Sequence, residues 1–84
     1  MKKKIAKKTI ILYVLKLLYQ GTSEENPATQ TQIVHVLNSL GVECERRTIA
    51  RNLQYLIDFG LPIVKKKGGY YYCQEKDNFF TKKI

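Results

Sequence analysis

The stretch VECERRTIARNLQYL, residues 42–56, holds all three arginines of the chain within six residues, whereas every lysine lies elsewhere. Arginine and lysine carry the same charge, so a need for charge alone would not separate them. Arginine differs by its planar, five-donor guanidinium, which pairs in a bidentate way with phosphate oxygens or a guanine edge. The clustering of Arg46, Arg47 and Arg51 therefore predicts a surface that recognises geometry as well as charge.

This stretch has the apolar spacing of a helix from about Arg46 to Phe59, which Gly60 and Pro62 end. The side expected to face a core consists of Ile49, Leu53, Leu56 and Ile57. At about 100° per residue, the opposite side carries Arg47, Arg51, Gln54, Tyr55 and Asp58, flanked by Thr48, Ala50 and Asn52. Arg46 falls nearer the apolar side, but at the helix start its long side chain can still reach a phosphate.

The polar side chains of this helix are those that hydrogen-bond base edges and phosphates, and Ala50 is small enough to allow close approach. Such a set is typical of a recognition helix in the DNA major groove. The alternative is a basic helix face that only meets solvent. The clustered arginines and the turn before them favour recognition.

Composition narrows the class of protein. The chain has 84 residues, a formal net charge of +8 and 44% hydrophobic residues, which indicates one small globular domain with a polyanionic partner. Nucleic acid and an anionic membrane both satisfy this charge. The lysine-rich start and the apolar run from Ile10 to Tyr19 resemble a secretory signal, but Lys16 interrupts the run and no A-x-A-like cleavage site follows. The run is also about half the length of a membrane span, so we expect a helix of the fold and no membrane partner.

That first helix is predicted from about Lys4 to Tyr19. Its helical apolar stripe consists of Ile5, Ile11, Leu12, Leu15, Leu18 and Tyr19. Four further residues, Ile10, Tyr13, Val14 and Leu17, widen the stripe beyond one face. A helix that is apolar nearly all round must be covered on several sides. We therefore expect a second contact, with another copy in a homodimer or with a neighbouring domain; coverage by the small fold itself is the alternative.

A second helix follows the loop QGTSEENPA, residues 20–28. Thr29 and Gln32 form a predicted capping box at its start, and Gly41 is its predicted end. Its expected buried side is Ile33, Val36, Leu37 and Leu40, with His35 pointing to solvent. The connection VECE, residues 42–45, leads into the third helix.

The stretch PIVKKKGGYYYC, residues 62–73, predicts a two-stranded hairpin. Gly68 and Gly69 can supply the positive φ angles of a tight turn. Lys65, Lys66 and Lys67 crowd the first strand and the tip, where they can contact phosphates or guard a sheet edge against pairing. The strand residues Tyr70, Tyr71 and Tyr72 alternate, so Tyr71 faces away from its neighbours; alternation alone does not show which side meets the core.

Nothing in the sequence indicates an enzyme. No nucleophile–base pair, metal-ligand cluster or phosphate-binding loop occurs, so we expect no catalytic residues, no metal and no cofactor. Cys44 and Cys73 do not make a disulfide framework, and with His35 they are too few for a structural zinc site. Reduced thiols in a cytoplasmic protein are the expectation.

The order helix, helix, turn, helix and basic hairpin is that of a winged helix-turn-helix, mainly α with a small two-stranded wing. Residues 9–73 resemble the N-terminal domain of bacterial DeoR-type transcriptional regulators that carry a WYL domain, most specifically in GVECERRTIARNLQYLIDFGLPIV and GGYYY. The resemblance implies DNA contacts by Arg46, Arg47, Thr48 and Arg51, although Glu45 stands where the family tends to have Asp, a better N-cap. In that family a ligand-sensing domain lies downstream. We expect a DNA-binding domain over residues 1–73 and a tail or linker over 74–84, either as part of a larger regulator or as a small relative.

The predicted function is sequence-specific binding of double-stranded DNA in transcription regulation. The predicted contact residues are Arg46, Arg47, Thr48, Arg51, Asn52, Gln54, Tyr55, Lys65, Lys66 and Lys67. Two alternatives remain open. A small RNA-binding or ribosome-associated protein would share the charge and size, but would more often expose aromatic rings for stacking on unpaired bases. A protein-interaction module would use the apolar first helix.

Overall fold

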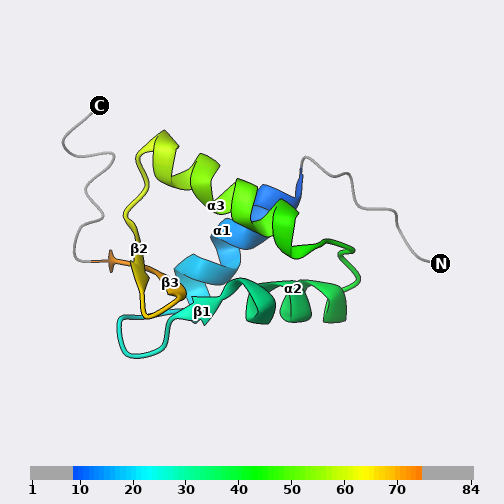
Figure 1. Ribbon diagram of the computed structural model, residues 1–84, viewed down its shortest axis with the longest axis horizontal. Coiled ribbons are helices and arrows are strands. Elements are labelled where there is room, and N and C mark those ends of the chain that lie inside the picture. Colours follow the sequence, from blue (N-terminus) through cyan, green and yellow to red (C-terminus); the bar gives the residue numbers. More distant parts are fainter. Residues whose placement is uncertain (1–8, 75–84) are drawn as a thin grey trace.

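The computed structural model describes residues 9–74, which form three helices and a three-stranded antiparallel sheet (Figure 1). The elements in chain order are α1 (Ile10–Gly21), β1 (Ala28–Thr29), α2 (Gln30–Ser39), α3 (Arg46–Phe59), β2 (Ile63–Lys66) and β3 (Gly69–Tyr72). The three predicted helices are confirmed. The part of the first helix predicted over Lys4–Lys8 and the tail over 75–84 lie outside the described residues. Within residues 9–74, no helix combines the length and apolar character that crossing a bilayer requires.

The side of helix α1 that faces the core coincides only in part with the predicted stripe: Leu18 is buried, and Ile11 and Leu15 pack against the core. Its buried residues are Ile10, Val14 and Leu18, which recur every four residues along one face. Leu12 is 61% exposed and Tyr19 is 48% exposed, so their assignment to the buried stripe was wrong. The expectation that Ile10 and Val14 need a second partner was also wrong, because the fold itself buries both.

Helix α2 is delimited by two local motifs, both as predicted. The Gln32 backbone N–H donates to the Thr29 hydroxyl at 3.1 Å, and the Thr29 N–H donates to the Gln32 side chain at 2.9 Å, which completes the capping box. At the other end Gly41 has φ 88°, and the Val42 N–H donates to the Leu37 carbonyl at 2.8 Å. This is a Schellman motif, in which glycine supplies the left-handed residue.

The core side of α2 is narrower than predicted. Ile33 and Leu37 are buried, but Val36 is exposed and Leu40 is 63% exposed, so both were wrongly placed in the core. The Schellman turn explains why Leu40 is exposed. It reverses the chain just beyond α2, so that Val42 is buried there and Leu40 is not. Val34, at the edge of the same core, is partly buried.

Helix α3 begins and ends where the sequence predicts. Ile49, Leu53 and Leu56 are buried, Ile57 is partly buried, and Gly60 adopts the left-handed conformation at the C-cap. The Glu45 side chain forms no capping hydrogen bond. This agrees with the weaker capping expected of glutamate than of aspartate.

The sheet has three strands in the order β1-β3-β2, where two were predicted. The added strand β1 is the end of the predicted loop: Ala28 pairs with Tyr70 and Thr29 with Gly69. The pairing brings Pro27 against Gly69, where a Cβ atom would lie 2.9 Å from the Pro27 Cβ. Only glycine fits this close approach without a shift of the neighbouring chain.

The hairpin turn lies one residue earlier than predicted. Lys66 pairs with Gly69, so the central turn residues are Lys67, at φ 50°, and Gly68, at φ 83°. Positive φ at both central residues matches the right-handed twist of a two-residue hairpin. Gly69 itself belongs to β3, and the reason for glycine at that position is Pro27 rather than the turn.

Strand β3 connects the hairpin to the helices. Tyr70 and Tyr72 belong to the hydrophobic core. Tyr71, which lies between them and so points to the opposite face of the strand, is buried but is not part of that core. The Tyr72 ring packs edge-on against the Tyr19 ring, with 4.9 Å between centroids. In addition, the Tyr72 N–H donates to the Thr22 hydroxyl at 3.0 Å, just beyond α1. These contacts fix the position of the hairpin relative to the helices.

We expect Gly69→Ala to destabilise the fold by about 1–3 kcal/mol, because the new methyl group overlaps Pro27 and forces β1 and β3 apart. Gly21→Ala is the matched control, since beyond its chain neighbours and its own helix backbone no heavy atom lies within 4 Å of the added Cβ. Denaturant unfolding of both variants measures the difference. Equal stability of the two variants would contradict the close contact between Pro27 and β3.

Candidate nucleic-acid interface

The outer face of α3 consists of Arg47, Arg51, Gln54, Tyr55 and Asp58, and all five side chains are exposed. It arises because the opposite side of the helix is buried. Arg46 is also exposed, at the first turn of the helix. No carboxylate among residues 9–74 forms a salt bridge with Arg46, Arg47 or Arg51. Within that part of the chain, the guanidinium groups therefore keep their donors for an external acceptor.

Two of the predicted contact residues are set back from this face. Thr48 is partly buried, and Asn52 is only 9% exposed. Asn52 lies about 100° round the helix from Arg51, next to the side that carries Leu56, and the fold encloses it. The amide of Asn52 therefore lies on the packed side of α3, away from the outer face, and its DNA contact stays a prediction.

Gln54 and Asp58 are joined on the outer face. The Gln54 Nε2 donates a hydrogen bond of 2.8 Å to the Asp58 Oδ1, one helical turn further along. Both side chains are exposed, so solvent or a ligand can reach the pair. The sequence places the two residues on one side of the helix but does not show that they bond.

The three wing lysines have different surroundings. Lys65 Nζ lies 5.9 Å from the centroid of the Tyr70 ring, within the range of a cation–π contact. Lys66 Nζ lies 3.5 Å from the Glu24 carboxylate and 3.5 Å from the Glu24 carbonyl oxygen. Lys67 is exposed in the hairpin turn. Lys67 therefore projects most freely, whereas Lys66 is bound to the loop between α1 and β1.

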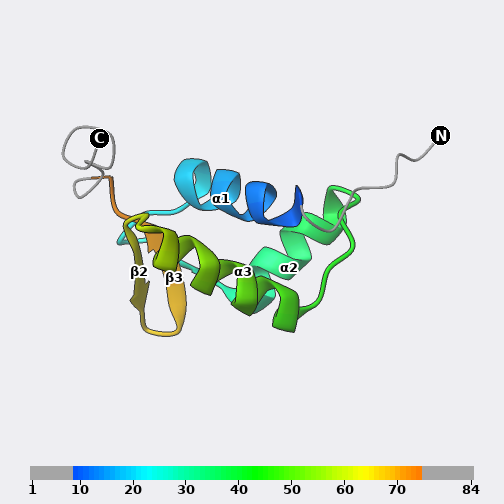
Figure 2. The ribbon, with the colours of Figure 1, turned by 90° about the horizontal axis from the view of Figure 1, so that it is seen from above.

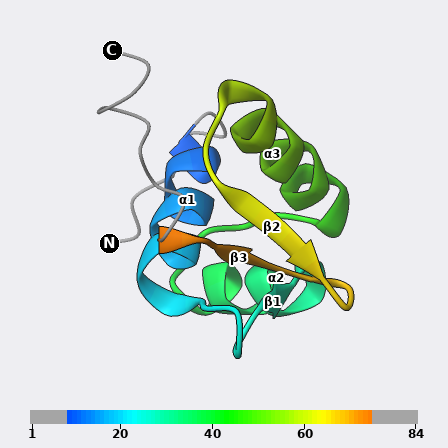
Figure 3. The ribbon, with the colours of Figure 1, turned by 90° about the vertical axis from the view of Figure 1, so that its left-hand side faces the viewer.

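The wing turn and the N-terminal end of α3 reach the same side of the molecule, and α1 lies on the opposite side (Figure 2). Figure 3 shows β2 and β3 running side by side across the molecule to the hairpin turn, which lies at the same edge as one end of α3. The clustered arginines and the wing lysines come from segments separated in sequence, but one large flat or grooved polyanion can meet both.

Sequence reasoning missed two features near this surface. Glu24 lies in the predicted loop, 42 residues before Lys66, and no local pattern indicates so distant a pairing. Phe59 is 67% exposed at the C-terminal end of α3. At about 100° per residue, Phe59 lies about 80° round the helix from Arg51, on the same side as Tyr55. The sequence spacing alone could therefore have predicted Phe59 beside Tyr55.

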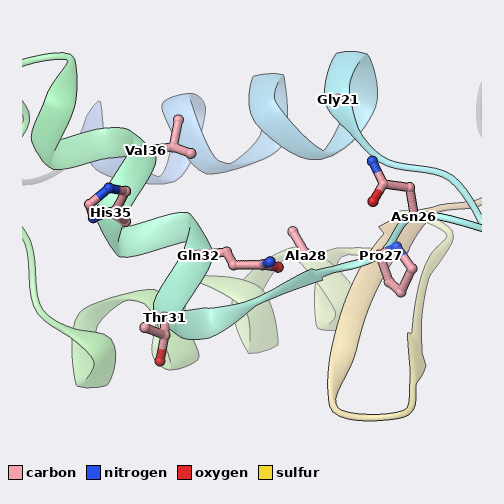
Figure 4. Close-up of a pocket in the computed structure, with 8 residues that line it drawn as sticks. All are labelled: Gly21, Asn26, Pro27, Ala28, Thr31, Gln32, His35 and Val36. Atoms are coloured by element: carbon pink, nitrogen blue, oxygen red, sulfur yellow. The ribbon is translucent and has the colours of Figure 1, made fainter.

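A shallow pocket of about 410 Å³ lies between the end of α1, the loop before β1 and α2 (Figure 4). It is lined by Gly21, Asn26, Pro27, Ala28, Thr31, Gln32, His35 and Val36. His35 is exposed, as predicted, and Gln32 is engaged in the capping box. No carboxylate, lysine or arginine lines the pocket, so it offers little to hold a charged ligand.

The two cysteines are free thiols in separate parts of the fold. Cys44 lies in the turn before α3, where its N–H donates to the Asn38 side chain at 3.3 Å. Burial raises the pKa of the Cys44 thiol, which favours the neutral form. Among residues 9–74, no three His, Cys, Asp or Glu side chains gather as a metal site.

We expect Glu24→Gln to strengthen binding of a polyanion, because it frees Lys66 as well as removing a negative charge. Glu25→Gln is the matched control: Glu25 is exposed, and it forms no salt bridge within residues 9–74. Binding of a labelled duplex over a salt series should show a slope of log K against log salt steeper by up to about 0.9 for Glu24→Gln than for Glu25→Gln. Identical slopes would mean that Lys66 is no less available in the parent.

Comparison with known proteins gives this chain no relative. No protein-family model, curated protein or solved structure matches it. The resemblance to DeoR-type regulators is therefore untested by these comparisons and stays a prediction.

Proposed function

We propose that the chain is a winged helix-turn-helix domain that binds double-stranded DNA in a sequence-specific way, as all or part of a transcriptional regulator. The observation that carries the proposal is the common orientation of two basic elements. The arginine-bearing end of α3 and the lysine-bearing wing turn lie on one side of the molecule (Figure 2). A duplex can meet both together, through its groove and its phosphate backbone.

The arrangement of the helices supports this proposal. A short turn over residues 40–45 connects α2 to α3, and α3 packs against both α1 and α2 through its apolar side. This packing leaves the outer face of α3 exposed along its length. An exposed, polar helix held on a rigid scaffold is what entry into a major groove requires.

The side chains support a division of roles. Arg47 and Arg51 lie one turn apart on the outer face, where their guanidinium groups can pair with guanine edges. We assign Arg46, exposed at the start of the helix, to a phosphate contact. Lys65, Lys66 and Lys67 on the wing add charge near the backbone, because lysine is a flexible point charge and a weaker reader of geometry.

The net charge supports a polyanionic partner of this kind. A formal charge of +8 on 84 residues raises the rate of association with nucleic acid and its non-specific affinity. Two further parts complete the proposal. A cytoplasmic location rests on the two free cysteines, and membership of the DeoR-type WYL-associated regulators rests on the sequence resemblance alone.

Exposed aromatic rings favour a second candidate function. Tyr55 is 53% exposed and Phe59 is 67% exposed, both on the C-terminal half of α3. Aromatic rings that face solvent beside basic residues can stack on unpaired bases, as RNA-binding proteins do. Binding to single-stranded RNA is therefore the competing proposal.

One experiment separates the two candidates. The chain is incubated with a random pool of duplex DNA and, in parallel, with a random pool of single-stranded RNA, and bound molecules are enriched over several rounds. The DNA proposal expects a defined duplex sequence to emerge and to compete strongly against the RNA. Enrichment from the RNA pool alone would replace it with the second candidate.

We expect Arg47→Ala and Arg51→Ala each to weaken binding of the enriched duplex by about 1–3 kcal/mol, because each removes a bidentate base contact. Binding of an unrelated duplex should fall much less. Arg46→Ala is the matched control, and should weaken both duplexes alike. If Arg47→Ala and Arg51→Ala also weaken both equally, these residues contact phosphates and do not read bases.

We expect replacement of Lys65, Lys66 and Lys67 together by glutamine to lower affinity without changing the preferred sequence. Removing one lysine–phosphate pair should flatten the slope of log K against log salt by about 0.9, so the triple variant should flatten it by on the order of 1–3 units. Binding of one labelled duplex across a salt series measures the slope. An unchanged slope would mean that these lysines only protect the sheet edge.

We also propose that two copies associate through the exposed side of α1, which leaves α3 and the wing free on the opposite side (Figure 2). Leu12, 61% exposed, is the main apolar residue of that side. Sedimentation over a range of concentrations should show a monomer–dimer equilibrium that Leu12→Gln weakens. Leu40→Gln on α2 is the control, since Leu40 is 63% exposed but lies on another helix. A strict monomer at high concentration would contradict this assembly.

A further inference from the structure

The hydrogen bond between Gln54 and Asp58 settles how the Gln54 amide is oriented. A carboxylate only accepts hydrogen bonds, so the amide NH₂ group must face Asp58, at 2.8 Å from Oδ1. The Gln54 Oε1 therefore points away from Asp58. In a free glutamine the two orientations would interchange and the side chain would sample many rotamers.

The amide keeps the groups that read one particular base. An amide nitrogen carries two hydrogens, of which Asp58 accepts one. The other N–H donor and the Oε1 acceptor remain side by side. Adenine presents a matching pair in the major groove, an acceptor at N7 and a donor at N6, and glutamine pairs with it in a bidentate way.

We propose that Gln54 reads an adenine and that Asp58 is the positioning residue that holds its amide ready to do so. This inference rests on the proposed function, because it requires the outer face of α3 to lie in a DNA major groove. Asp58 acts through Gln54 and need not touch the base itself. The bond also removes side-chain freedom that would otherwise be lost when DNA binds.

The position of Gln54 on α3 locates the adenine. Gln54 follows Arg51 by three residues, which is about 4.5 Å along the helix axis. Successive base pairs are about 3.4 Å apart. The adenine should therefore lie one or two base pairs from the base that Arg51 contacts, on the side towards the C-terminal end of α3.

A glutamine and an aspartate four residues apart can also form a bond that only stabilises the helix. The two roles differ in what they change. A purely structural bond affects unfolding of the helix but leaves the base preference of Gln54 intact. A positioning bond affects the preference at a single base pair, while the preference set by Arg51 remains.

The test compares the parent with Gln54→Ala, Asp58→Ala and Asp58→Asn. A preferred duplex is first enriched with the parent, and four duplexes are then made that differ only at the adenine position. The parent should prefer adenine by on the order of tenfold or more. Gln54→Ala should abolish this preference, and Asp58→Ala should reduce it to within about threefold while keeping the preference at the Arg51 base pair.

Asp58→Asn tests whether the orientation of the Gln54 amide matters. The asparagine side chain can accept from the Gln54 Nε2 or donate to the Gln54 Oε1, so this variant keeps a bond but no longer fixes the orientation. Its adenine preference should lie between those of the parent and Asp58→Ala. If Asp58→Ala keeps the full preference for adenine, the positioning role is wrong. The inference is also overturned if the enriched site has no adenine that depends on Gln54.

Failure of the inference can be distinguished from failure of the proposed function. If the parent enriches no duplex sequence, sequence-specific DNA binding is wrong, and the adenine inference falls with it. If the parent enriches a site that depends on Arg47 and Arg51 but not on Gln54 or Asp58, the proposed function stands and only the inference is overturned.

Discussion

Burial of the apolar side of α3 is the constraint on which the rest of the structure depends. Ile49 and Leu53 are almost completely enclosed, and Leu56 extends the same side towards the C-terminal end. Because successive residues of a helix are about 100° apart, fixing this side also fixes the opposite one. The outer face that carries Arg47 and Arg51 is thus a direct consequence of core packing, and so is the enclosure of Asn52.

The position of the wing depends on a second set of contacts, which tie β3 to the end of α1. The Thr22 hydroxyl donates to the Leu18 carbonyl at 2.6 Å and accepts from the Tyr72 N–H at 3.0 Å. One side chain thereby satisfies backbone groups of a helix and a strand that are far apart in sequence. At the hairpin end of β3, Pro27 lies against Gly69 and holds β1 in the sheet. A hairpin of two strands alone is marginally stable, and these contacts make it a fixed part of the domain.

The two basic elements differ in the freedom of their side chains. On α3 the arginines project from a packed helix, while Gln54 is held by Asp58. On the wing, Lys67 stands free in the turn, whereas Lys66 is held by the loop residue Glu24. A rigid helix suits the recognition of base edges, where small displacements matter. A wing with flexible charges suits contact with a backbone that offers the same phosphate at every step.

Local sequence determined where α2 and α3 begin and end. The capping box at Thr29, the left-handed Gly41 and Gly60, and the bounds of α3 were all predicted, because each depends on residues within about one helical turn. The outward set of α3 was largely predicted for the same reason, since its apolar spacing leaves a single side for the core. The hairpin was predicted too, from a run of β-prone residues on either side of a glycine pair.

Tertiary structure decided which residues face one another. The apolar positions of α1 surround the helix, so periodicity alone could not choose between the side with Val14 and the side with Leu12, and packing against the other elements chose Val14. Three further features likewise depend on partners distant in sequence: the exposure of Leu40, the strand that begins at Ala28, and the need for glycine at position 69 in β3. Local patterns specify what a segment can form, whereas the side that becomes buried is set by the surfaces that distant segments bring to it.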